Sequence, residues 1–114
     1  MYLIGEILLN VAKGLIMTIV KTKNGEELVI APEGMLDTAN APAFDAEMET
    51  AVAETNKLVL DFAKVQYISS SGLRVLLKAQ KKVAASGEMK LINVCAAVKE
   101  VFELTGFTNI LTIV

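Results

Sequence analysis

Three consecutive serines, Ser69, Ser70 and Ser71, are the residues of this chain best placed for chemistry. They follow the run LVLDF (58–62) and precede a glycine and a helical pattern. A hydroxyl at a helix start can accept from backbone N–H groups that lack a partner within the helix. A phosphorylated hydroxyl also suits this place, because the free N–H donors and the helix dipole attract an anion. The residues alone leave two interpretations, a helix cap and a phosphate acceptor.

The rest of the sequence offers no catalytic set around these serines. There is no histidine among the 114 residues, which removes the commonest general base and metal ligand. A single cysteine, Cys95, excludes an internal disulfide and a thiolate metal cluster within one chain. We interpret Cys95 as a small core residue. We therefore predict no catalytic residue, no metal and no cofactor, and a protein that is not an enzyme.

The composition predicts one domain with an aliphatic core, since 54% of residues are hydrophobic and 5% aromatic. The net charge of −2 is too balanced to favour nucleic acid or an anionic membrane as the main partner. A basic stripe in the third quarter of the chain fits a solvated helix face, or a contact with an acidic partner: Arg74, Lys78, Lys81 and Lys82. The single cysteine agrees with a cytoplasmic location.

Hydrophobic periodicity predicts the elements that must position the serines. The first two strands should form a hairpin, because Asn24-Gly25 lies between them. Asn40 is the predicted N-cap of the first helix, and Gly87 a left-handed cap at the end of the second. The expected strands are 18–21, 28–31, 57–62, 90–94 and 110–114, and the expected helices follow 40, 71 and 95. This order is typical of an α/β domain with a mixed sheet.

The segment YISSSGLRVLL, after LVLDF, closely resembles the signature of the STAS domain, specifically of bacterial anti-sigma-factor antagonists. In that family the corner reads Asp-Ser-Ser/Thr-Gly-Leu, and the serine after the aspartate is phosphorylated by the anti-sigma factor. Matched by position, Ser70 stands at the phosphate acceptor, Ser71 at the next hydroxyl and Gly72-Leu73 at the glycine and leucine. Ser69 departs from the pattern, because it replaces the aspartate.

The resemblance also implies the fold and the partner surface. It implies a small mixed sheet packed with three to four helices over residues 17–114. The segment Gly34 to Asp37 resembles the family's Gly-x-Leu-Asp loop, which lies beside the phosphorylation corner. Asp37 has an alternative role in turn or helix-start chemistry, and both readings stay open. The implied partner-binding residues are Asp37, Thr38, Ser69, Ser71, Gly72 and Arg74.

The function implied by the resemblance is that of a phosphorylation-controlled binding module. Its unphosphorylated form sequesters an anti-sigma factor, which is a serine protein kinase, and so frees a sigma factor. A serine phosphatase is the expected second partner. One alternative is a STAS subunit of another regulatory or transport complex. Another is an aspartyl-phosphate receiver using Asp61, although TIVKTK (18–23) lacks the acidic pair that would hold Mg²⁺.

Residues 1–16 form an aliphatic extension of uncertain status. Ile4, Leu8, Val11 and Leu15 would form one stripe of an amphipathic helix. The segment is too short to span a membrane as a helix, and it lacks the pattern of a secretory signal. It would serve as an extra interface, for example in a homodimer, or as a membrane-surface helix. The other interpretation is a misplaced translation start, since Met17 opens a sequence that resembles the family's usual beginning.

Overall fold

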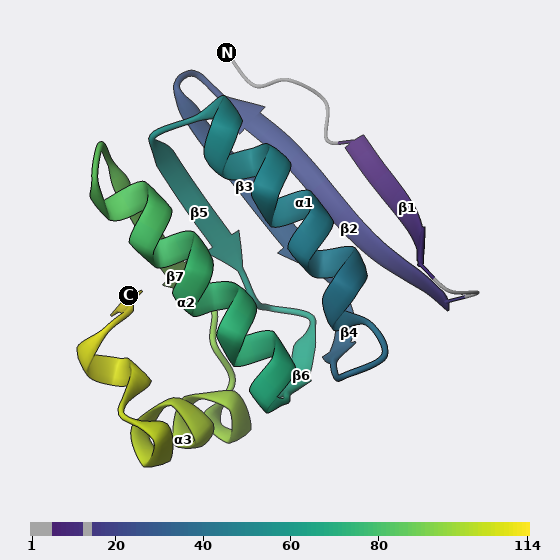
Figure 1. Cartoon of the computed structure of the whole chain (residues 1–114), viewed down its shortest axis with the longest axis vertical. Helices are drawn as coiled ribbons and strands as arrows, with labels where there is room; N and C mark the ends of the chain where they lie inside the picture. Colours follow the sequence, from purple (N-terminus) through teal and green to yellow (C-terminus); the bar gives the residue numbers. More distant parts are fainter. Residues whose placement is uncertain (1–5, 13–14) are drawn as a thin grey trace.

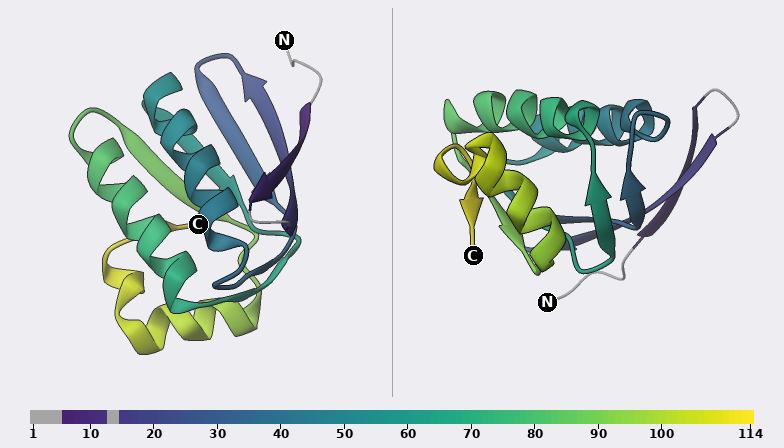
Figure 2. Two further views of the ribbon diagram at one scale, coloured as in Figure 1. Left: turned by 45° about the vertical axis from the view of Figure 1, so that its right-hand side comes forward. Right: turned by 90° about the horizontal axis from the view of Figure 1, so that it is seen from below.

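The computed structural model describes the backbone of residues 6–12 and 15–114 and the side chains of residues 17–114. A six-stranded mixed sheet has the order β1-β2-β3-β5-β7-β8, and β4 and β6 form a separate two-stranded sheet. Helices α1 and α2 lie side by side in one layer over one face of the large sheet (Figures 1 and 2). The elements are β1 (Glu6–Ala12), β2 (Leu15–Asn24), β3 (Glu27–Pro32), β4 (Gly34–Leu36), α1 (Ala41–Glu54), β5 (Lys57–Asp61), β6 (Val65–Ile68), α2 (Ser70–Ala84), β7 (Glu88–Ile92), α3 (Ala96–Thr105), the 3₁₀ turn η1 (Phe107–Asn109) and β8 (Thr112–Ile113).

The predicted hairpin is confirmed as the antiparallel pair β2–β3. Gly25 has φ +63°, and the pairing of Asn24 with Glu27 closes the turn around it. Strand β2 is longer than predicted, since it begins at Leu15. Pro32 ends β3, as expected for a residue that cannot donate to a ladder. The sequence-local turn signal thus determines the start of the sheet.

Strands β3, β5, β7 and β8 are parallel, and their helix-facing side chains make the core. Leu58, Val59 and Leu60 of β5 are all buried, which agrees with their saturated apolar run. Strand β7 begins two residues before the predicted 90–94, and the predicted last strand is the short edge strand β8. The largest side chains removed from solvent are Phe44, Phe62 and Phe102.

The predicted helix over the first sixteen residues is wrong for the part that the structure describes. Residues 6–12 form β1, which pairs antiparallel with β2 through the register Glu6↔Lys21 to Ala12↔Leu15. Leu8 and Val11 of the proposed stripe therefore lie in β1, and Leu15 opens β2. Ile4 lies outside the described residues. Pairing with β2 satisfies the backbone groups on one side of β1. A short aliphatic run does not distinguish a strand from a helix.

Two segments predicted to be irregular contain strands. Residues 34–36, expected as a loop, form β4, and β6 lies between the run 58–62 and Ser69, where no strand was predicted. The two strands are parallel and hydrogen-bond to each other. They are three and four residues long, too short to show a period of two that could be recognised in the sequence.

Gly87 does not have the predicted role of a left-handed cap. The glycines with positive φ in the described part of the chain are Gly25, Gly34 and Gly106, and Gly106 ends α3 at φ +79°. A Cβ atom added to Gly87 would overlap the carbonyl oxygen of Asn56 and would lie 2.6 Å from the Cβ atom of Asn56. Gly87 is therefore required for the close approach of two backbones.

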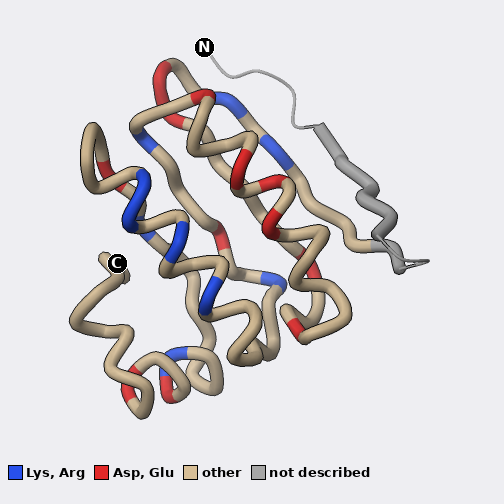
Figure 3. The backbone as a smooth tube through the Cα atoms, in the orientation of Figure 1, with Lys and Arg blue, Asp and Glu red and all other residues tan. Residues whose placement is uncertain are grey.

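Opposite charges gather on the two neighbouring helices, with acids along α1 and bases along α2 (Figure 3). Lys78 joins them: its Nζ lies 2.6 Å from Glu49 Oε1 and 3.2 Å from Asp45 Oδ1. The hydrogen bond and the charge of Lys78 hold the pKa of Glu49 below its ordinary value of 4.5. Hydrogen bonds to Glu49 and Asp45 raise the pKa of Lys78 above 10.5.

We expect Lys78→Met to lower the free energy of unfolding slightly near neutral pH, because the pair is exposed to solvent. A lowered carboxyl pKa stabilises the fold above the unfolded pKa, and this contribution is lost as the pH falls through the folded pKa. While Glu49 and Asp45 are charged, the raised lysine pKa stabilises the fold below 10.5, and this contribution is lost as the pH rises through the folded pKa. Urea unfolding should therefore separate Lys78→Met from wild type at about pH 7 but not at about pH 2.5. Lys81→Met is the matched control. An equal loss in its free energy of unfolding would show that the effect comes from general surface charge and not from the Lys78 ion pairs.

Candidate functional site

The pairing of β4 with β6 places two polar segments side by side. Leu36 pairs with Ile68 at the carboxyl ends of these parallel strands. The backbone N–H of Ser69 donates to the carbonyl oxygen of Leu36 at 2.8 Å. Asp37 and Ser69 therefore leave neighbouring strands at the same end, as predicted, although the strands belong to the small sheet. We call residues 37–38 together with 69–72 the serine corner.

Ser69 is the helix cap of the serine corner. It has an extended backbone (φ −92°, ψ 174°), and its Oγ accepts from the N–H of Gly72 at 3.3 Å. Its carbonyl accepts from the N–H of Leu73 at 2.9 Å. The serine that replaces the family's aspartate therefore still performs a capping role, because serine and aspartate both present a side-chain oxygen to the first turn.

The next two hydroxyls have different surroundings. Ser71 is half-buried, and its Oγ lies 3.5 Å from Thr38 Oγ1 across the serine corner. Ser70, the first residue of α2, is exposed, and no described residue forms a hydrogen bond with its Oγ. With the cap supplied by Ser69, the hydroxyl of Ser70 is left open to a partner. The cap and the candidate phosphate acceptor are thus separate residues.

Asp37 organises the turn that leads into α1. Its Oδ1 accepts from the N–H of Asn40 at 2.9 Å, and its carbonyl accepts from the N–H of Ala41 at 2.9 Å. Asn40 occupies the predicted cap position, but its side chain does not cap the helix; its Nδ2 donates to the carbonyl of Met35 at 2.9 Å. The predicted N-cap position of Asn40 is therefore confirmed, but the cap is made by its backbone carbonyl, which accepts from the N–H groups of Ala43 and Phe44, and not by its side chain. The turn chemistry considered for Asp37 is confirmed.

Gly72 permits the close contact between α2 and the small sheet. A Cβ atom at this position would lie 2.8 Å from Ile68 Cγ1 and 3.1 Å from the carbonyl oxygen of Leu36. The first contact would force Ile68 or the helix start to shift, and the second is tighter than most Cβ contacts in proteins. Gly72 therefore sets the position of the serines relative to Asp37 and Thr38.

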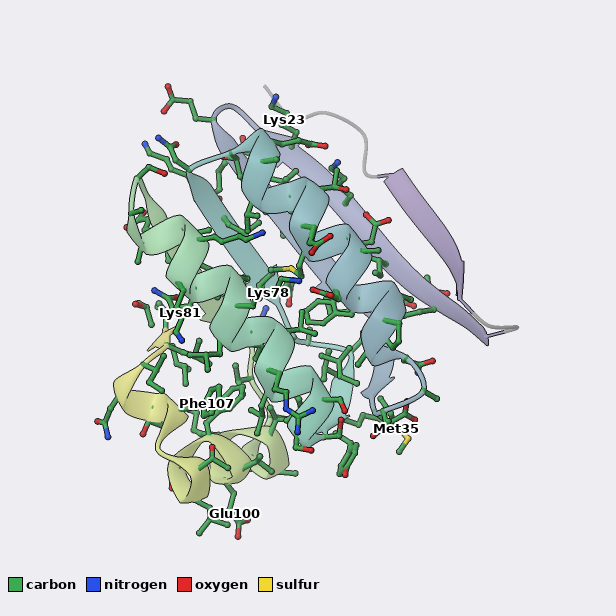
Figure 4. The ribbon with its side chains drawn as sticks, in the orientation of Figure 1. Lys23, Met35, Lys78, Lys81, Glu100 and Phe107 are labelled. Carbon is green, nitrogen blue, oxygen red and sulfur yellow. The ribbon has the colours of Figure 1, made fainter. Side chains whose placement is uncertain are left out.

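Two exposed apolar side chains border the serine corner, and no local sequence pattern predicts that they form a pair. Met35 and Tyr67 pair in the β4–β6 register, and they are 48% and 45% exposed. Met35 projects outward at the β4 end of the molecule (Figure 4). The available signal was that each precedes a buried strand residue, Leu36 or Ile68, but the register that joins them is not local.

Arg74 lies one helical turn beyond Ser70 and is exposed. Unlike Lys78, it forms no ion pair with any carboxylate in the part of the chain that the structure describes. Arg74 therefore adds an uncompensated positive charge beside the serine corner.

Asp61, the alternative phosphate acceptor, ends β5 as expected. Its Oδ1 accepts from the N–H of Ala63 at 3.0 Å and from Asn93 Nδ2 at 3.1 Å. Among the residues described, no three acids, histidines or cysteines come together to hold a metal ion. The arrangement around Asp61 is that of a turn linking β5 to β6 and β7, and it gives the receiver alternative no support.

The fold and the site together define a class of protein: an α/β domain with an exposed serine at the start of a helix. The model of the STAS domain family matches residues 18–114. BtrV of Bordetella bronchiseptica, which carries the provisional description of an anti-sigma factor antagonist, is 38% identical over 85 residues, or 73% of each chain. The chain belongs to the STAS domain family.

Solved structures confirm the predicted fold class, and the described residues form three α-helices against the three to four expected. An anti-sigma factor antagonist from Mycobacterium paratuberculosis has a TM-score of 0.79 at 22% identity, covering 90% of this chain and 88% of its own. A Thermotoga maritima protein that carries the provisional description of an anti-sigma factor antagonist has a TM-score of 0.76 at 24% identity, covering 82% of each chain. The Bacillus protein SpoIIAA in its phosphorylated form has a TM-score of 0.62 at 20% identity, covering 96% of this chain and 91% of its own.

Proposed function

We propose that this protein is an anti-sigma factor antagonist whose binding is controlled by phosphorylation of Ser70. The observation that carries the proposal is the exposed Ser70 hydroxyl, free of hydrogen bonds to described residues at the first position of α2. The resemblance of YISSSGLRVLL to the STAS signature, which matches Ser70 to the phosphate acceptor, supports this assignment. The role described for BtrV supports the proposal.

The chemistry requires no catalytic residue from this chain. The anti-sigma factor is a serine protein kinase that binds ATP, and it transfers the γ-phosphoryl group to Ser70 Oγ. A new P–O bond forms at the serine, the bond to ADP breaks, and the hydroxyl proton is lost. A serine phosphatase restores the hydroxyl by hydrolysis. In this proposal the protein itself acts as a cytoplasmic binding module and not as an enzyme. Separately, no described helix is long and apolar enough to cross a membrane.

The docking surface comprises the serine corner, the neighbouring pair Met35 and Tyr67, and Arg74. Exposed aromatic and methionine side chains are enriched at protein interfaces, where they supply apolar anchors. The polar residues of the serine corner would orient the partner around these anchors through hydrogen bonds. We place Asp37, Thr38, Ser69, Ser71 and Gly72 in this surface for their position, although several of them also have structural roles.

We also propose that residues 1–16 are an extension of a domain formed by residues 17–114. This extension would mediate a homodimer. Strand β1 lies at the edge of the large sheet, and an edge strand is a template for pairing with another chain. Sedimentation equilibrium of the full chain against residues 17–114 tests the dimer, and a monomer in both would exclude it.

The experiment that tests the function is a pull-down from the source cells with wild type, Ser70→Ala and Ser70→Asp as baits. Ser86→Asp, an exposed position at the far end of α2, is the matched control for added charge. We expect wild type, Ser70→Ala and Ser86→Asp to capture an ATP-binding serine kinase, and Ser70→Asp to lose it. Equal recovery of one other partner by all four baits, with Ser70 unmodified, would contradict the proposal and favour a STAS subunit of another complex.

A further inference from the structure

Arg74 follows Ser70 by four positions on α2, so the two side chains are neighbours on the helix surface. Both are exposed. The next basic residue on this face, Lys78, is already bound to Glu49 and Asp45 of α1. Arg74 is thus the cation that is both adjacent to Ser70 and without a carboxylate partner in the described structure.

We propose that Arg74 binds the phosphate of phosphorylated Ser70 within the same chain. The inference rests on the proposed function, because it requires phosphorylation of Ser70. A guanidinium group binds two phosphate oxygens at once, which an ammonium group does not match. The order of the pair is also favourable, with the anion nearer the helix N-terminus and the cation one turn later.

The pair gives phosphorylation a second effect on the docking surface. Before modification, the guanidinium of Arg74 is available to an acidic group of the partner. After modification, it is held by the phosphate, and the sum of the two side chains changes from +1 to about −1. The partner therefore meets a dianion and at the same time loses a cation. Arg74 is therefore proposed as a positioning residue, because its guanidinium would hold the phosphate of Ser70.

The charged groups around the proposed pair define the controls. Asp37 lies across the serine corner at the end of β4 and repels a phosphate, although its Oδ1 is held by the N–H of Asn40. Lys78 is one turn beyond Arg74 and is neutralised by α1. On α3, which packs against β6, the charged residues are Lys99, Glu100 and Glu103. Lys81, exposed and further along α2, carries the same charge as Arg74 at a greater distance.

The test is a ³¹P NMR titration of the full chain with phosphoserine incorporated at position 70 by genetic code expansion. We expect the second phosphate pKa in wild type to lie below its ordinary value of about 6. Arg74→Gln should raise it by at least about half a unit, and Arg74→Lys should give an intermediate value. Lys81→Gln should leave it unchanged. Asp37→Asn should lower it in every background, which verifies that the phosphate senses its neighbours.

Equal pKa values in Arg74→Gln and Lys81→Gln, with Asp37→Asn still effective, would overturn the proposal. This result is distinguishable from failure of the proposed function, because phosphoserine is introduced without the kinase. Binding of the anti-sigma factor by the same phosphorylated wild-type protein is measured separately. Retained binding contradicts the function, whereas lost binding with an unresponsive pKa contradicts only the role of Arg74.

Discussion

Phosphorylation of Ser70 is expected to lower the affinity for the anti-sigma factor by about 10³-fold, which corresponds to about 4 kcal/mol. The phosphate replaces the neutral, exposed hydroxyl of Ser70 with a charge of about −1.5 to −2. Docking must then desolvate a hydrated dianion that no group of the partner is arranged to match. The fold itself need not change, because a helix start accommodates an anion. Calorimetric titration of the two forms against the kinase recovered in the pull-down measures the ratio.

The control for this prediction is phosphoserine at position 86, which adds the same charge far from the serine corner. It should change the affinity by less than about tenfold, since exposed charges separated by more than a Debye length are screened. Far-ultraviolet circular dichroism of both phosphorylated forms should match that of wild type. A ratio below about tenfold for phosphorylated Ser70, with the fold intact, would show that the phosphate does not control docking.

Gly87→Asn should be the most destabilising of the glycine substitutions, with a loss of roughly 3 kcal/mol in the free energy of unfolding. The reason is steric, because a Cβ atom would overlap the Asn56 carbonyl, and that carbonyl accepts from the N–H of Glu88 at 2.8 Å. To relieve the overlap, the start of β7 must move away from the start of β5. Urea unfolding followed by circular dichroism measures the loss.

Gly106→Asn is the matched control, because it makes the same chemical change at a position with φ +79° and open space around the added Cβ. Asparagine tolerates this left-handed conformation, so the expected loss is below about 1 kcal/mol. Equal losses at Gly87 and Gly106 would show that both act as ordinary helix caps. That outcome would contradict the close approach of Gly87 to Asn56.

The arrangement of the serine corner explains why three serines occur together. Ser69 satisfies the first turn of α2, Ser71 faces Thr38, and Ser70 alone presents an open hydroxyl. The position of all three depends on Gly72, which lets the helix start approach Leu36 and Ile68. A structural cap and a regulatory acceptor therefore coexist in adjacent residues, and each has its own set of contacts.

Local patterns in the sequence predicted the features that depend on neighbouring residues. Asn24-Gly25 predicted the hairpin, the apolar run at 58–60 predicted a buried strand, and the serine run predicted the start of α2. Each follows from a period, a turn residue or a cap that acts within a few positions. The family signature at Ser70 to Leu73 then identified the α/β fold that the structure confirms.

Only the tertiary structure decided the features that join distant segments. The pairing of β4 with β6 brings Met35 beside Tyr67 and Thr38 beside Ser71, positions 32 and 33 residues apart (67 − 35 and 71 − 38). The contact of Gly87 with Asn56 and the pairing of β1 with β2 are likewise set by partners and not by the segments themselves. The local sequence of a short strand or a glycine does not specify which distant segment it will contact. The roles of these residues therefore depend on the tertiary structure.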